Sequence, residues 1–187
     1  MEASIGAAST MTTRTPVPLS EYLETAYHPD CEWIDGEVRE RNTGEGQHSV
    51  VQGFFIQVMG NLAREWNIRV LPEQRVQTSA TRYRVADVCV SRRSSPFEAI
   101  VRTAPLICIE ILSRDDRMSD MQEKVDDYLQ MGIEMVWVVD PRRRKAFQTD
   151  GRSLQPVDVL TVHETPIRIP VTDVFVELDE LEGKIRD

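Results

Sequence analysis

The sequence predicts an α/β (α+β) fold, in which a mixed β-sheet is flanked by helices and contains a parallel βαβ crossover unit. Residues 106–112, apart from one acid, and residues 135–139 are apolar throughout, which is typical of strands buried on both faces. Residues 119–131 between them have helical periodicity. A strand, a helix and a strand in this order predict a crossover, so the two strands should be parallel.

Length and composition indicate one globular domain. The chain has 187 residues, 41% of them hydrophobic, which is enough to bury a core. Residues 1–17 are expected to be a flexible leader without a signal-peptide core, and residues 18–187 a single domain. No apolar run approaches the ~18 residues that cross a bilayer, so we expect a cytoplasmic protein without a membrane partner.

The net charge of −9 argues against a protein that coats nucleic acid, because phosphate contacts need Lys and Arg. Basic residues gather in segments 79–117 and 142–145, and two interpretations of them stay open. They form either a locally basic face for DNA or RNA, or a solvated charged surface. The three cysteines match no metal motif, and we expect Cys89 and Cys108 to be core residues in a reducing compartment.

The N-terminal third is expected to contain a short helix, a hairpin and a long helix. The short helix begins within residues 18–23, with Ser20 as its N-cap. Asp35–Gly36 stands between two extended runs and predicts a β-hairpin over residues 31–40. Apolar residues then recur every three or four positions from 47 to 66, which predicts a helix with one apolar face.

His48 lies in the first turn of that long helix. At about 100° per residue it points the same way as the apolar stripe, toward the protein interior. Two interpretations stay open: a hydrogen-bonded core histidine, or a histidine directed into a site at that end of the helix.

Two strands, 70–77 and 84–90, are separated by a turn and should pair antiparallel. A short helix is expected near residues 97–101, within the loop that follows. The C-terminal region should add short elements, namely a hairpin at 145–151, edge elements at 157–161 and 166–170, and a helix or strand at 173–178.

The crossover helix has clear predicted ends. Ser119 is a candidate N-cap, and Gln122, three residues later, completes a capping box. Gly132 follows the helix at the position where a left-handed residue commonly ends it.

Asp87 and Glu110 are the main functional clue, because each is an acid inside an apolar strand. An ionised carboxylate there is costly unless something pairs with it. If the two strands are neighbours, the carboxylates converge at one end of the sheet. Two or three oxygen ligands plus waters usually hold Mg²⁺, for which Mn²⁺ can substitute, and such a metal polarises a phosphodiester and activates water.

Lys124 is the best-placed cation to stabilise transition-state charge beside these acids, since it lies on the helix that crosses over the sheet. The structural alternative is a plain scaffold. In that case Asp87 and Glu110 would pair with buried Arg84 or Lys124 and have no catalytic role.

This order of features resembles the PD-(D/E)XK nuclease superfamily. More narrowly, it is similar to a bacterial family described as "putative restriction endonucleases" and long treated as a domain of unknown function. The resemblance covers roughly residues 18–178. The matching parts are residues 32–37, His48, residues 85–88, residues 109–113, Lys124, Tyr128, Gly132 and residues 134–141.

The resemblance implies a restriction-endonuclease-like core and a Mg²⁺-dependent endonuclease that hydrolyses phosphodiester bonds of DNA. Asp87, Glu110 and the backbone carbonyl of Ile111 would hold the metal, and Asp87, Glu110 and Lys124 would be catalytic. The supporting residues would be Glu32, His48 and Tyr128.

Two departures from the superfamily pattern stand out. Ala86 stands where the superfamily motif has Pro, and Leu112 stands where the Glu-x-Lys motif has Lys. In the family that this chain resembles, the lysine has moved to the crossover helix, and Lys124 matches that position. The second departure and the net charge favour an alternative, a catalytically weak or inactive nuclease-fold protein that serves as a binding or regulatory module. A homodimer is expected, because cutting both strands of a duplex commonly needs two active sites.

Overall fold

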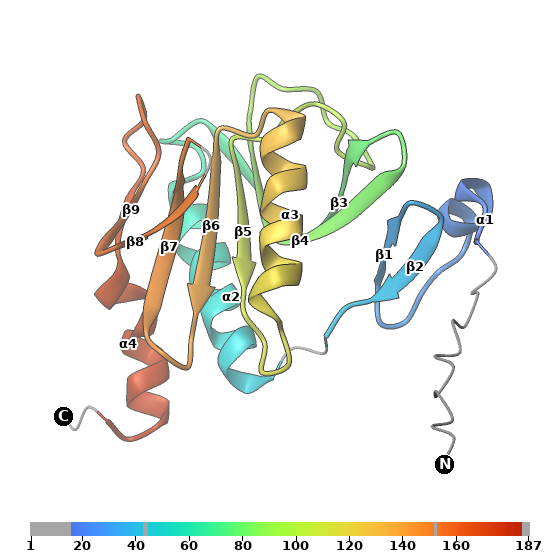
Figure 1. Cartoon of the computed structure of the whole chain (residues 1–187). Coiled ribbons are helices and arrows are strands. Elements are labelled where there is room, and N and C mark those ends of the chain that lie inside the picture. The colour runs from blue at the N-terminus through green and yellow to red at the C-terminus, as the bar shows by residue number, and fades with distance from the viewer. Residues whose placement is uncertain (1–15, 43–44, 152, 185–187) are drawn as a thin grey trace, which may run out of the picture.

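The computed structural model describes residues 16–42, 45–151 and 153–184, so nearly all of the predicted leader lies outside the described residues. The chain forms a mixed sheet flanked by helices, as predicted (Figure 1). The helices are α1 (Leu19–Glu24), α2 (Gly46–Leu62), α3 (Met118–Met131) and α4 (Val171–Leu181). The strands are β1 (Cys31–Ile34), β2 (Glu37–Glu40), β3 (Ile68–Ser79), β4 (Arg82–Arg92), β5 (Ile107–Ile111), β6 (Met135–Asp140), β7 (Lys145–Asp150), β8 (Ser153–Val157), β9 (Val159–Thr161) and β10 (Arg168–Pro170).

The main sheet has the order β2–β1–β4–β5–β6–β7–β8, and β3 pairs with β4. β5 and β6 are parallel and are joined through α3, which confirms the predicted crossover unit. β4 and β5 are antiparallel, with Val88 opposite Ile109. Because of this register, Asp87 and Glu110 stand opposite each other on adjacent strands.

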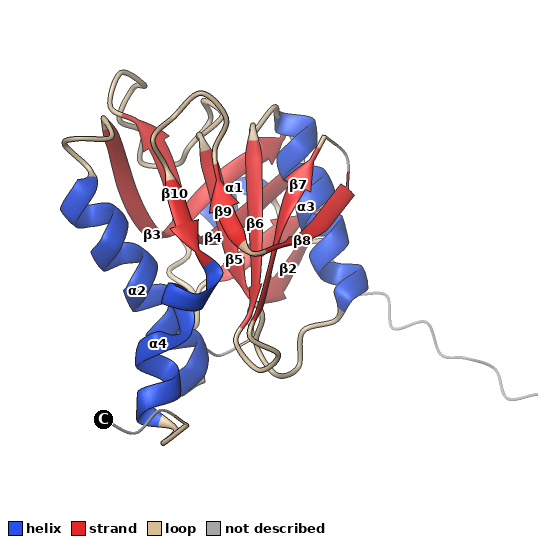
Figure 2. Cartoon of the chain, turned by 90° about the vertical axis from the view of Figure 1, so that its left-hand side faces the viewer, coloured by secondary structure: helices blue, strands red, loops and turns tan. Residues whose placement is uncertain are grey.

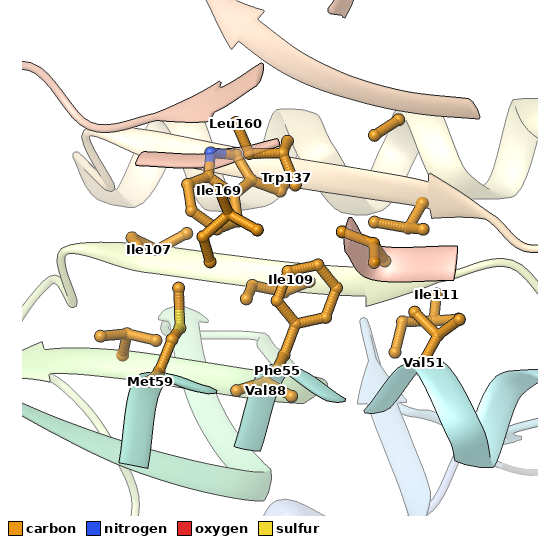
Figure 3. Packing of buried hydrophobic residues seen from close by; sticks show 14 of the residues in the cluster. Val51, Phe55, Met59, Val88, Ile107, Ile109, Ile111, Trp137, Leu160 and Ile169 are labelled. Atoms are coloured by element: carbon orange, nitrogen blue, oxygen red, sulfur yellow. The ribbon is translucent and has the colours of Figure 1, made fainter. Parts of the chain in front are cut away.

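Helices cover both faces of the sheet. α2 and α4 lie on one face and α3 on the other (Figures 1 and 2). The larger core lies beneath α2 and α4, where Phe55 and Met59 meet the apolar side chains of β5 and β6 (Figure 3). Phe55 and Trp137 are fully buried, with ring centroids 6.1 Å apart. No helix in the described part of the chain is both long enough and apolar enough to cross a membrane.

An aromatic cluster of Tyr22, Trp33 and Tyr83 attaches the N-terminal hairpin to β4. The Tyr22 hydroxyl donates to the carbonyl of Cys31 at 2.8 Å, and Trp33 pairs with Tyr83 across the strands. The turn at Asp35–Gly36 has φ of 51° and 94°, as the predicted hairpin requires. Glu32 is thereby held beside β4.

The predicted N-caps are wrong at two helices. α1 begins after Pro18, so Ser20 lies inside it, and no side chain caps it. α3 begins one residue earlier than expected, after Arg117, so Ser119 is already helical. Gln122 donates instead to Asp126, one turn later on the same helix. The residue at the N-cap is Arg117, whose extended backbone precedes the helix without a side-chain cap.

The short helix expected at residues 97–101 is also absent from the structure. Val101 instead forms a bridge to Val76 of β3, with its N–H 2.9 Å from the carbonyl of Arg75. The edge of a long strand offered unpaired backbone groups, and pairing with them outweighed the weak local helix preference. The Gly132 prediction is confirmed, with φ of 92° at the end of α3.

We expect Phe55→Ala to lower the free energy of unfolding by about 3–5 kcal/mol, because it leaves a cavity against Trp137. Phe97→Ala is the matched control, since Phe97 is 77% exposed, and its effect should stay within about 0.5 kcal/mol. Urea unfolding measures both. Equal effects of the two substitutions would contradict the position of the core.

Candidate active site

All the predicted site residues except Tyr128 meet in one cleft of about 650 Å³, at the end of the sheet where α2 begins and where α3 crosses. Tyr128 is fully buried and contacts Glu110. Asp87, Glu110, Lys124, Glu32 and His48 all line it. Ten acidic and five basic residues line the cleft, so it has an acidic excess that attracts cations.

Asp87 is almost completely buried on β4. Its Oδ2 accepts the N–H of Ile111 at 2.7 Å and lies 3.2 Å from His48 Nε2, while its Oδ1 contacts the guanidinium of Arg41. Burial by itself would raise the pKa of Asp87, but His48, Lys124 and Arg41 outweigh it and lower the pKa. Asp87 is therefore ionised at neutral pH.

His48 contacts Asp87 from the first turn of α2, so it is directed into the site and also buried as a core residue would be. Burial acts to lower the pKa of His48. The hydrogen bond and the charge of Asp87 outweigh burial and raise that pKa above its usual value.

Glu110 lies fully within the protein on β5, where both of its carboxylate oxygens have donors. The Tyr128 hydroxyl donates to Oε1 at 2.7 Å, and Lys124 Nζ donates to Oε2 at 2.7 Å. Burial raises the pKa of Glu110 to about 7, although the charge of Lys124 opposes this shift. Glu110 thus takes up a proton more readily than a glutamate in water does.

Lys124 reaches the acids from α3, which the sequence alone did not determine. Its Nζ lies 2.7 Å from Glu110, 2.9 Å from Glu32 and 2.8 Å from the carbonyl oxygen of Val85. Burial would lower the pKa of Lys124, but the two carboxylates raise it, so the ammonium keeps its charge.

Glu32 connects Lys124 to a second group of charges. It accepts from Arg84 Nη1 at 2.8 Å and from the N–H of Val85 at 3.1 Å, and Arg84 in turn lies 2.6 Å from Asp127. Lys124 and Arg84 overcome the effect of burial and lower the pKa of Glu32 to about 2. Buried charges with this many partners hold Lys124 in one orientation.

Two residues of the cleft were missed in the sequence analysis. Arg41 follows β2 and contacts both Asp87 and Glu73, and Glu73 lies on β3 beside β4. No motif or apolar pattern singled them out. The single acid in residues 70–77 was the only available signal, and it is weak because β3 lies at an edge, where charged residues are common.

The residues partly fit a divalent cation. Among residues 16–42, 45–151 and 153–184, no group of three or more His, Cys, Asp and Glu side chains is arranged to hold a metal. Two carboxylates and the carbonyl of Ile111 supply hard oxygen donors, and Mg²⁺ commonly binds to one or two carboxylates while it keeps several waters. The fit requires Arg41 to release Asp87 Oδ1.

A family model described as "Uma2: Putative restriction endonuclease" matches residues 19–181. The crystal structure of "a putative nuclease belonging to DUF820" from Anabaena variabilis has a TM-score of 0.75 and 23% identity, and the match covers 86% of this chain and 98% of that one. At this identity the likeness shows the fold. A DrdV–DNA complex matches with a TM-score of 0.39 and 15% identity over 70% of this chain and 11% of that chain, too weak to carry an argument. No curated protein matches the sequence.

The lowered pKa of Glu32 makes stability depend on pH. The folded pKa of about 2 is below the ordinary value of 4.5, so the stabilisation is present above about pH 4.5 and is lost as the pH falls toward 2. We expect Glu32→Gln to lower the free energy of unfolding by about 3 kcal/mol at pH 7. Between about pH 5 and 3, the free energy of unfolding of this variant should decline less steeply than that of the wild type. Urea unfolding across this range tests it, and parallel declines in the two proteins would contradict it.

Proposed function

The chain belongs to the Uma2 family of putative restriction endonucleases, and on this premise we propose that it is a metal-dependent nuclease that hydrolyses phosphodiester bonds of DNA. One observation carries the proposal. Asp87 and Glu110 lie side by side on β4 and β5, and the Nζ of Lys124 is 2.7 Å from Glu110. Two acids and a lysine in one cleft are suited to phosphodiester hydrolysis.

The proposed metal ligands are Asp87, Glu110 and the carbonyl of Ile111, and the proposed cation is Mg²⁺, with Mn²⁺ as a substitute. A bound divalent cation supplies a Lewis acid that polarises the phosphodiester and lowers the pKa of water. The backbone supports this arrangement, because the N–H of Ile111 fixes Asp87 while the carbonyl of the same residue is a candidate ligand.

Lys124 would stabilise the negative charge that develops on the phosphoryl oxygens. In the sequence, Leu112 stands where the superfamily motif has its lysine. Lys124 instead reaches the Glu110 carboxylate from α3. Tyr128 and Glu32 act as positioning residues, because Tyr128 holds Glu110 and Glu32 holds Lys124. His48 similarly orients Asp87.

DNA is the proposed substrate because restriction endonucleases act on DNA, and a homodimer is proposed because a duplex has two strands to cut. The acidic excess of the cleft opposes binding of a phosphate backbone, so a divalent cation would also reduce this repulsion.

A second candidate function is a nuclease-fold binding or regulatory module that does not cleave. The contact between Arg41 and Asp87 favours it, since a guanidinium occupies an oxygen that a metal would need. Cleavage assays on single- and double-stranded DNA and RNA, with Mg²⁺ and Mn²⁺, separate the two functions.

Metal binding to the wild type should raise its thermal stability. At a hundredfold excess over Kd the gain is about 2.7 kcal/mol, and Asp87→Asn or Glu110→Gln should abolish it. Differential scanning calorimetry with Mn²⁺ or EDTA measures this. Asp173→Asn, an exposed substitution on α4, is the control and should retain the wild-type shift. A full shift in Asp87→Asn would rule out this carboxylate as a ligand.

Lys124→Gln should reduce the rate of DNA cleavage by about 10²–10³-fold, because one stabilising cation is lost from the transition state. Single-turnover cleavage of a labelled duplex measures the rate, and calorimetry in EDTA shows whether the variant folds. Cleavage at the wild-type rate by a folded Lys124→Gln protein would remove Lys124 from the mechanism.

A further inference from the structure

Arg41 occupies the place in the cleft where a cation is expected. It follows β2, and its side chain is only 18% exposed. Its Nη2 donates to Asp87 Oδ1, and its Nη1 donates to Glu73 Oε2, so one guanidinium connects two carboxylates. The other oxygen of Asp87 already accepts from Ile111 and contacts His48. Oδ1 is therefore the Asp87 oxygen best placed for a further ligand, and Arg41 holds it.

Glu73 reaches this position through an irregular backbone. It lies in the middle of β3 with φ of 48°, a left-handed conformation that is costly for a residue other than glycine. Regular pairing with β4 is interrupted at this point, between the pairs Pro72–Val88 and Gln74–Ala86. Gln52 of α2 donates both to Glu73 and to the carbonyl of Asp87, the latter at 3.0 Å. These contacts hold the Glu73 carboxylate beside the Asp87 backbone.

We propose that Arg41 is a built-in counter-cation that competes with a divalent cation for Asp87, and that Glu73 retains Arg41 when the cation binds. This inference rests on the proposed function, because it takes the metal site at Asp87 and Glu110 as given. It adds Arg41 and Glu73 to the residues that determine metal affinity.

Charge and geometry support the competition. A guanidinium and a divalent cation within a few ångströms of each other repel, so each weakens the binding of the other to the same carboxylate. Arg41 also does not become an unpaired buried charge when it leaves Asp87, since its contact with Glu73 can persist. The Glu73 side chain is 45% exposed, so this end of the pair lies nearer to solvent than Asp87.

The test measures Mn²⁺ affinity by isothermal titration calorimetry, without substrate, on the full chain. Arg41→Gln should bind Mn²⁺ at least about tenfold more tightly than wild type, equivalent to about 1.4 kcal/mol. Arg92→Gln is the matched control, because Arg92 lies at the end of β4 outside the cleft lining, carries the same charge and pairs with Glu134 at 3.3 Å. Its affinity should stay within about threefold of wild type, since a surface charge acts weakly through solvent.

Glu73→Gln tests the second part of the inference. With its alternative partner weakened, Arg41 should stay on Asp87, so Mn²⁺ should bind more weakly to Glu73→Gln than to wild type. The same substitution in the Arg41→Gln background should have a smaller effect, and the difference measures the coupling. An equal or larger loss in that background would overturn this part and indicate that Glu73 is a direct ligand.

The outcomes separate this inference from the proposed function. Equal affinities of wild type and Arg41→Gln, abolished by Asp87→Asn, would overturn the inference and leave the metal site intact. If Mn²⁺ binds to Arg41→Gln but not to the wild type, the result would support the inference and would count against metal-dependent cleavage by the wild type. Absence of binding in every variant would overturn both. Arg41→Ala is a second removal of the charge, and unfolding in EDTA shows that each variant is folded.

Discussion

The buried ammonium group of Lys124 is the interaction on which the rest of the site depends. It lies between Glu32 from the N-terminal hairpin and Glu110 from the central sheet, and it also donates to the backbone of β4. Each of these groups would be costly to bury without the others. The hairpin, the sheet and the crossover helix are therefore joined at a single point by charge, and a change at any of the three residues affects the other two.

The fold places this point at one end of the sheet. The crossover unit positions α3 across β5 and β6, which directs Lys124 and Tyr128 toward Glu110. On the opposite face, the apolar core packs against α2 (Figure 3). His48, in the first turn of α2, contacts Asp87. The packing on each face of the sheet is apolar, and the polar groups of the site are concentrated in the cleft at one end of the sheet. The core thus supplies the rigidity that a preorganised charged site needs.

Charge balance within the cleft differs between its two halves. Around Lys124, the carboxylates have buried cations that stay charged, and the pKa of Glu32 is low. Around Asp87, the balancing cation is Arg41, which comes from the segment after β2 and keeps a second partner in Glu73. The first half is a fixed network within the core. The second half has one guanidinium that contacts two carboxylates at once, and the Glu73 carboxylate is the more exposed of the two.

Local pattern in the sequence determined much of this protein. Apolar runs indicated the crossover unit, and one acid in each of two apolar strands indicated Asp87 and Glu110, because a lone carboxylate in a buried strand needs a partner wherever it lies. The Asp35–Gly36 turn and Gly132 were readable because a positive φ restricts residue type. Tertiary structure alone decided the pairing of Val101, where backbone pairing with β3 outweighed a weak local preference. It also decided that Lys124 reaches Glu110 and that Arg41 meets Glu73 and Asp87. These contacts join residues far apart in the chain, and only the register and packing of the sheet determine such distances.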